Sequence, residues 1–128
     1  IESKMTIDRY IDQCVVVANE RKFVSALIVP DFQALEAYAN QNGIGFASHE
    51  ELCCKPEIVE FLRNRIDTLQ QDLSDYERIK HFILLPTPFS VESGELTNTL
   101  KVKRNVVYKR YADMIDQLYR KAEQNFKP

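Results

Sequence analysis

The sequence has no long apolar run and no excess of basic charge. Its longest apolar stretch, residues 26–30, is far shorter than the roughly 20 residues that span a membrane. The formal net charge of −2 argues against a dedicated nucleic-acid-binding domain, which is usually strongly basic. Composition therefore predicts a globular domain with no transmembrane segment and no nucleic-acid partner.

Cysteine and histidine are also scarce. Cys14, Cys53 and Cys54 are an odd number without a Cys-x-x-Cys spacing, and the adjacent Cys53 and Cys54 lie too close to form an unstrained disulfide. His49 and His81 are far apart and belong to no metal-ligand pattern. We therefore expect structural or solvated roles for these five residues, a reducing intracellular setting and no metal site.

Length and composition fit an ordinary globular domain. The chain has 128 residues, of which 45% are hydrophobic and 28% charged. A chain of this size suits one hydrophobic core, and no internal repeat, low-complexity run or linker interrupts it. We expect a single domain over residues 1–128.

Two β-branched apolar stretches, residues 14–18 and 23–29, predict a β-hairpin. The polar residues 19–22 between them suit a four-residue loop. Residues 79–85, IKHFILL, predict a third strand that ends at Pro86. A three-stranded sheet packed with helices is an α+β fold.

Apolar residues recur at helical spacing in three stretches. The first follows Asp31, which suits the N-cap, and ends at Asn42 and Gly43. The second starts at Pro56, a residue favoured in the first turn, and the third starts at Asn105. Their inward positions are Phe32, Leu35, Tyr38 and Ala39 in the first, Ile58, Leu62, Ile66, Leu69 and Leu73 in the second, and Val107, Tyr111, Met114, Ile115 and Leu118 in the third. Polar residues expected on the solvent face of the second are Arg63, Arg65, Gln70, Gln71 and Asp72.

The segment 94–104, GELTNTLKVKR, carries the strongest functional signal. Residues 90–100 are expected to form a loop, and the segment joins its turn-prone, hydroxyl-rich end to a basic stretch. Its candidate phosphate-binding positions are Gly94, Thr97, Thr99, Lys101, Lys103 and Arg104. Backbone N–H groups and cationic side chains in such loops bind anions, most often phosphate. A solvated basic loop before a helix has the same composition, so this segment alone leaves both interpretations open.

Four segments in order carry a family resemblance. They are Ile1-Glu2, the hairpin segments DQCVVV and RKFVSALIVPD, the segment LSDYERIKHF at 73–82, and GELTNTLKVKR. Together they resemble the C-terminal domain of adenylate-forming enzymes, in the long-chain fatty acyl-CoA synthetase branch. The resemblance covers essentially the whole chain and implies the small lid domain of that fold.

The resemblance implies a role for Lys101. In that family a lysine of the last motif acts when a fatty acid carboxylate attacks the α-phosphate of ATP, and the resemblance places it at Lys101. The superfamily usually has glycine before this lysine, where this chain has Leu100. Lys103 is the competing position, and the spacing between Lys101 and Arg104 favours Lys101.

The resemblance also implies partners outside this chain. ATP, Mg2+ and the fatty acid are bound mainly by a larger N-terminal adenylation domain, which is not part of this sequence, so the fragment alone is expected to be inactive. The small domain rotates between two orientations, one for adenylate formation and one for transfer to CoA. Arg21 and Lys22 at the hairpin turn could meet CoA phosphates in the second orientation, although charge at a turn is by default solvated.

Two other functions are compatible with the sequence. One is a non-enzymatic interaction module, and the other is a small anion- or RNA-binding domain that uses Lys101, Lys103, Arg104, Lys109 and Arg110. The negative net charge and the lack of aromatic residues on a basic strand argue against RNA binding. We expect a cytoplasmic protein, and the fatty acid substrate is compatible with peripheral membrane association.

Overall fold

The computed structural model describes the backbone of residues 2–17 and 23–125. Arg21 and Lys22, and with them the predicted hairpin loop, lie outside the described residues. Helices and strands follow in the order α1 (Glu2–Thr6), β1 (Ile11–Val17), β2 (Val24–Pro30), α2 (Phe32–Gln41), α3 (His49–Cys54), α4 (Pro56–Leu69), the 3-10 turn η1 (Asp75–Glu77), β3 (Ile79–Leu84), α5 (Arg104–Arg110) and α6 (Ala112–Asn125).

The chain divides into two compact units, Ile1–Pro88 and Phe89–Pro128. The first contains the sheet and helices α1 to α4, and the second contains a long loop followed by α5 and α6. The predicted single domain over residues 1–128 stays a prediction.

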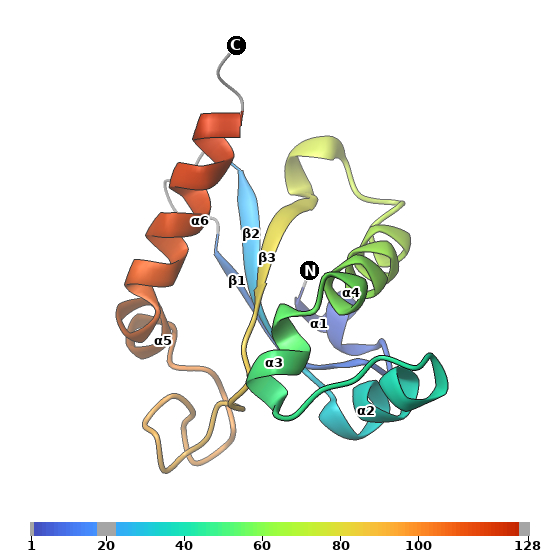
Figure 1. Cartoon of the computed structure of the whole chain (residues 1–128). Coiled ribbons are helices and arrows are strands. Elements are labelled where there is room, and N and C mark those ends of the chain that lie inside the picture. Colours follow the sequence, from blue (N-terminus) through green and yellow to red (C-terminus); the bar gives the residue numbers. More distant parts are fainter. Residues whose placement is uncertain (1, 18–22, 126–128) are drawn as a thin grey trace. The chain divides into compact units, whose positions relative to one another are not determined.

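The first unit contains a three-stranded sheet in the order β1-β2-β3. Strands β1 and β2 are antiparallel, with Cys14 opposite Ile28, and β2 and β3 are parallel, with Ala26 opposite Phe82. Parallel neighbours need a crossover connection, which contains α2, α3 and α4 here (Figure 1). The predicted hairpin strands, third strand and α+β class are confirmed.

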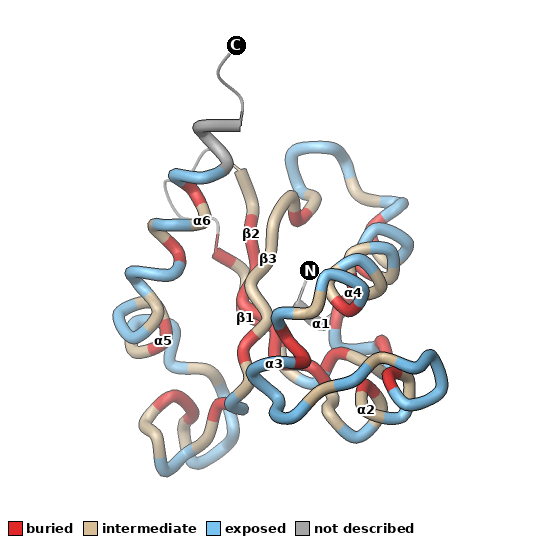
Figure 2. The backbone as a smooth tube through the Cα atoms, in the orientation of Figure 1, coloured by how far each residue is buried: buried red, intermediate tan, exposed pale blue. Residues whose placement is uncertain are grey.

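Two apolar clusters hold this unit together. One joins α1 and α4 to the sheet, and its buried members are Met5, Ile11, Cys14, Ala26, Ile28, Ile66 and Ile79. The other joins α2, α3 and α4 through Leu35, Ala39, Leu52, Ile58 and Leu62. Figure 2 shows buried residues along the strands and on one side of α4. Full burial of one such aliphatic side chain contributes about 1.5–3 kcal/mol to the free energy of unfolding. Several of the buried side chains belong to the helical stripes predicted for α2 and α4, so these stripes account for much of the core.

The ends of the helices follow local chemistry. Asp31 is the N-cap of α2, where its carboxylate accepts a hydrogen bond from the Ala34 N–H at 3.2 Å. Asn42 is the C-cap, and Gly43 follows with a φ of 68° that suits glycine. Pro56 is the first residue of α4, as predicted. The residues between them contain the short helix α3, which begins at the N-cap Ser48.

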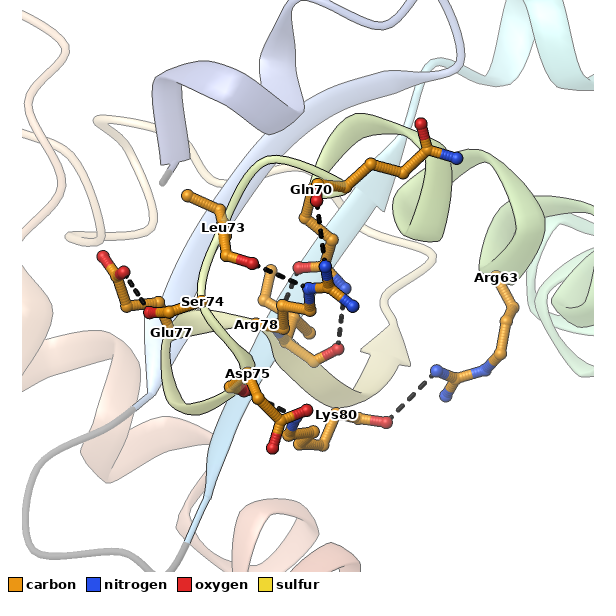
Figure 3. A network of polar contacts seen from close by, with 10 residues as sticks. Arg63, Gln70, Leu73, Ser74, Asp75, Glu77, Arg78 and Lys80 are labelled. Carbon is orange, nitrogen blue, oxygen red and sulfur yellow. Dashed lines mark hydrogen bonds and ion pairs between the residues drawn. The ribbon is translucent and has the colours of Figure 1, made fainter.

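The connection from α4 to β3 corrects the prediction that Gln70 faces solvent. Helix α4 ends at Leu69, so Leu73 lies beyond the helical stripe, and Gln70 is only 2% exposed. The Gln70 amide accepts from the Ile79 N–H at 2.8 Å and donates to the Ile79 carbonyl at 3.0 Å. Arg78 donates to two carbonyl oxygens of the same turn, those of Leu73 and Gln71 (Figure 3). Gln70 is buried because it satisfies the backbone at the first residue of β3.

Arg65 is a second exception to the predicted solvent face of α4. Its guanidinium donates to both carboxylate oxygens of Asp8, with Nε 2.9 Å from each and Nη2 2.6 Å from Oδ1. The same guanidinium lies 4.6 Å from the ring centroid of Tyr10. The Asp8 side chain is 5% exposed, so a bidentate arginine compensates a carboxylate that water barely reaches.

The second unit ends in two helices where the sequence predicts one. Tyr111 separates α5 from α6 as the C-cap of α5, and its ring centroid lies 6.3 Å from that of Phe89. The buried residues of α5 and α6 are spaced by multiples of four along the chain, and they are Val107, Ile115 and Tyr119. This spacing turns Met114, predicted to face inward, toward solvent with 40% exposure.

Candidate functional site

Residues 95–103 form a small hairpin that begins in the predicted loop and extends three residues beyond it. Leu96 and Val102 form an antiparallel bridge, and the Lys103 N–H donates to the Glu95 carbonyl at 2.8 Å. The Thr97 N–H donates to the Lys101 carbonyl at 2.8 Å, which leaves residues 98–100 as the tip. The segment chosen for its composition is therefore an ordered hairpin that enters α5 directly.

The backbone at the tip has an unusual conformation at Leu100. Its φ is 64°, in the left-handed region that favours glycine, and the Leu100 N–H donates to the Thr97 carbonyl at 2.8 Å. Three-residue hairpin loops often have a turn followed by a left-handed residue, and Leu100 occupies that position. Gly94, before the hairpin, also has a positive φ of 84°.

The two predicted threonines serve the turn itself. The Thr97 hydroxyl oxygen accepts from the Lys101 N–H at 3.1 Å and lies 3.0 Å from the Thr99 hydroxyl. Thr97 thus pairs with Lys101 through both its backbone and its side chain. The two threonines therefore have a structural role at the tip, because their hydroxyls fix the backbone directly before Lys101.

Lys101 and Lys103 are exposed. In the part of the chain that the structure describes, neither lysine takes part in a salt bridge. Lys103 and Arg104 line a shallow surface hollow with Val102, Asn105 and Val106, and Arg104 is the first residue of α5. Lys101 and Lys103 of the hairpin and Arg104 at the start of α5 therefore lie in one short segment, with Lys101 nearest the tip.

Glu95, at the base of the hairpin, was not predicted as a functional residue. Its side chain is 3% exposed, its Oε1 accepts from the Ser93 hydroxyl at 2.6 Å, and its Oε2 lies 3.4 Å from Arg110 Nη1. Oε2 accepts no hydrogen bond from the described residues, so the contact to Arg110 is an ion pair without hydrogen-bond geometry. Burial, and next the negative charge of Glu95, raise the pKa of Tyr111. A glutamate in a polar loop gives no local sign of burial, so the sequence did not single it out.

The described residues contain neither a metal-binding cluster nor a membrane-spanning helix. No group of three or more histidine, cysteine or acidic side chains is placed to hold a metal ion. No helix among them is long and apolar enough to cross a membrane. Arg21 and Lys22, predicted for CoA, lie outside the described residues, and their role stays a prediction.

The fold is that of the C-terminal part of an adenylation domain. The chain is similar to the adenylation domain of a carboxylate reductase from Mycobacterium chelonae, with 27% identity and a TM-score of 0.72 over 92% of this chain and 17% of that one. Part of the A-PCP didomain of a carboxylic acid reductase from Segniliparus rugosus has the same fold, with a TM-score of 0.73 at 24% identity, over 96% of this chain and 16% of that one. The family model of the AMP-binding enzyme C-terminal domain matches residues 1–123, and the chain belongs to this family.

The relatives of this chain include long-chain-fatty-acid–CoA ligases. The chain is 33% identical over 122 residues to the long-chain-fatty-acid–CoA ligase FadD15 of Mycobacterium tuberculosis, covering 94% of this chain and 20% of that protein. It is 32% identical over 106 residues to long-chain-fatty-acid–CoA ligase 5 of Rattus norvegicus, covering 81% and 15%. The chain thus spans about a fifth or less of these relatives' length. The family resemblance predicted from the sequence is confirmed.

Proposed function

We propose that this chain is the C-terminal domain of an AMP-forming long-chain fatty acid–CoA ligase. In such a reaction the fatty acid carboxylate attacks the α-phosphate of ATP and releases pyrophosphate, and the acyl group of the adenylate then passes to the CoA thiol. The observation that carries the proposal is the ordered hairpin that presents Lys101, exposed and without a salt bridge among the described residues. The names of the relatives support the substrate class.

Lys101 would act in the first half-reaction. A carboxylate and a triphosphate repel each other, and negative charge shifts onto the α-phosphate and the leaving pyrophosphate as the bond forms. A lysine ammonium is a compact charge on a flexible stem, so it can contact both the carboxylate and the phosphate. A preorganised cation there stabilises the transition state more than the separated reactants. The hairpin contributes by fixing the backbone from which this side chain extends.

Most of the nucleotide site would lie outside this chain. Since the chain spans about a fifth of the length of the ligase FadD15, ATP, Mg2+ and the fatty acid would be bound mainly by the larger N-terminal domain. Thr97 and Thr99 would shape the hairpin, while Lys103 and Arg104 would add positive charge beside Lys101. Rotation of the small domain would then move Lys101 away from the reacting groups and turn the side that faces CoA toward them. On that side, Arg21 and Lys22 are the candidates for phosphate contact.

The proposal is tested by measuring the two half-reactions separately in the full-length enzyme. Lys101→Ala is expected to reduce fatty-acid-dependent adenylate formation by about a hundred- to a thousandfold, the usual effect of removing one preorganised contact to a transition state. Thioester formation from a preformed acyl-adenylate should be largely spared, because that step uses the other orientation. ATP–pyrophosphate exchange and transfer to CoA measure the two steps.

Lys103→Ala is the matched control, since Lys103 is exposed in the same hairpin two residues away. It should change adenylate formation much less than Lys101→Ala. A selective loss with Lys103→Ala alone would move the assignment to Lys103. An equal loss of both half-reactions in Lys101→Ala would count against the proposed role of this lysine.

A further inference from the structure

Glu95 connects the hairpin to the helix that follows it. Through its backbone carbonyl it accepts from the Lys103 N–H at 2.8 Å, directly before α5 begins. Through its carboxylate it meets Arg110, the last residue of α5, at 3.4 Å. One residue is thus tied to both ends of the same helix.

Arg110 makes a second contact on the same side of the hairpin. Its Nη2 donates to the Ser93 carbonyl at 3.0 Å, while Nη1 faces the Glu95 carboxylate. The planar guanidinium presents several donors in a fixed arrangement, so two simultaneous contacts restrict its orientation and that of residues 93–95. The Ser93 hydroxyl completes the group by donating to Glu95 Oε1.

The burial of Glu95 makes this group sensitive to substitution. Water barely reaches the Glu95 carboxylate, which is 3% exposed, and Arg110, whose side chain is 45% exposed, is placed to compensate its charge. Arg110→Met should cost more than removing both members, because it leaves the buried Glu95 carboxylate unpaired, whereas Glu95→Gln leaves only the half-exposed Arg110. The pair therefore couples the start of the hairpin to α5 through an ion pair whose carboxylate is shielded from water.

We propose that Glu95 and Arg110 are positioning residues, which set the direction in which the hairpin presents Lys101. The pair fixes the first strand of the hairpin to the end of α5, and the hairpin hydrogen bonds carry that constraint to residues 97 and 101. The structural part of this proposal concerns the chain alone, whereas its consequence for catalysis rests on the proposed function.

Hydrogen exchange tests the structural part without any activity. Glu95→Gln and Arg110→Met should each increase the exchange rate of the amides of Thr97, Leu100 and Lys103. The increase should be about tenfold or more in Arg110→Met, which also removes the hydrogen bond from the guanidinium to the Ser93 carbonyl. Exchange in β2 and α4 should stay unchanged. Asp72→Asn is the matched control, because it removes an exposed ion pair with Lys4 elsewhere in the chain. Unchanged exchange of the hairpin amides in both variants would overturn the proposal.

The half-reactions of the full-length enzyme test the catalytic consequence. Misplacing a catalytic group by about 1 Å can cost on the order of a hundredfold, so Glu95→Gln and Arg110→Met should lower the kcat of adenylate formation about ten- to a hundredfold. The KM for ATP and the transfer of a preformed acyl group to CoA should change little. Arg110→Lys, which retains the charge but not the two-point contact, should restore part of the rate.

The double variant Glu95→Gln/Arg110→Met separates positioning from general damage. It should be no slower than Arg110→Met, because it leaves no unpaired carboxylate at the buried position of Glu95. Equal losses in both half-reactions, accompanied by a lower melting temperature, would overturn the positioning role. If the wild-type enzyme showed no fatty-acid-dependent pyrophosphate exchange, the proposed function would fail, and the exchange rates of the hairpin amides would still decide whether the pair fixes the hairpin.

Discussion

The left-handed conformation of Leu100 predicts an unusual order of stability between alanine and glycine. At an ordinary position, alanine is more stable than glycine by about 0.4–1 kcal/mol, because glycine gives the unfolded chain more freedom. At a φ of 64°, a side chain with Cβ costs about 1–2 kcal/mol. The difference makes Leu100→Gly more stable than Leu100→Ala by up to about 1.6 kcal/mol. Both variants remove the same exposed leucine side chain, so its lost contacts cancel in the comparison.

Asn98 provides the matched control at the same hairpin tip. It is exposed, and among the described non-glycine residues only Leu100 has a positive φ, so Asn98→Ala should be more stable than Asn98→Gly. Urea unfolding of the four variants gives the two differences directly. With an m-value of about 2 kcal/mol/M, a difference of about 0.8 kcal/mol moves the midpoint by about 0.4 M. If alanine were favoured over glycine by the same amount at both positions, the conformational argument would be refuted.

Two further predictions concern side chains of the first unit, the buried Gln70 and the adjacent Cys53 and Cys54. Gln70→Leu should lower the free energy of unfolding by at least about 2 kcal/mol, because the Ile79 N–H and carbonyl both lose their partner. The same change at the exposed Gln71 should cost under about 0.5 kcal/mol in urea unfolding, and equal costs would contradict the role of Gln70. A thiol reagent at pH 8 should label Cys54, which is exposed, and Cys54→Ser should remove that labelling. Burial raises the pKa of Cys53 to about 12, so raising the pH to 9 should not form its thiolate, and labelling of Cys53 in the folded chain would contradict this.

The elements that the sequence predicts well are those whose burial follows a period. The stripe Ile58, Leu62 and Ile66 of α4 is fully buried, and the apolar run of β2 is buried along most of its length. An apolar side chain is stabilised by burial against any apolar partner, so in an uninterrupted helix such as α4 its spacing predicts which face turns inward. The break at Tyr111 between α5 and α6 is where this reasoning fails, for Met114.

Polar residues depend on a particular partner, and that partner can be anywhere in the chain. Arg65 pairs with Asp8 across 57 positions, and Glu95 pairs with Arg110 across 15. Neither pair forms a local pattern, so the sequence predicts a solvated arginine and leaves the glutamate unremarked. The functional segment was found for the opposite reason, since the residues of GELTNTLKVKR adjoin one another and resemble a family motif.

The hairpin tip has a fixed conformation in the folded chain. This matters because a flexible loop that became ordered only when the domain docks would cost conformational free energy. Fixing the backbone of one residue costs about 1–2 kcal/mol, so the three residues of the tip would cost about 3–6 kcal/mol if they became ordered only in the active enzyme. The contact that Lys101 is proposed to make is worth about 2.7–4 kcal/mol. A flexible tip could therefore cancel the whole benefit of the lysine. Here the Thr97 hydrogen bonds and the turn at Leu100 order the tip when the chain folds. The strain at Leu100 is therefore compatible with a favourable contribution of Lys101 to the transition state.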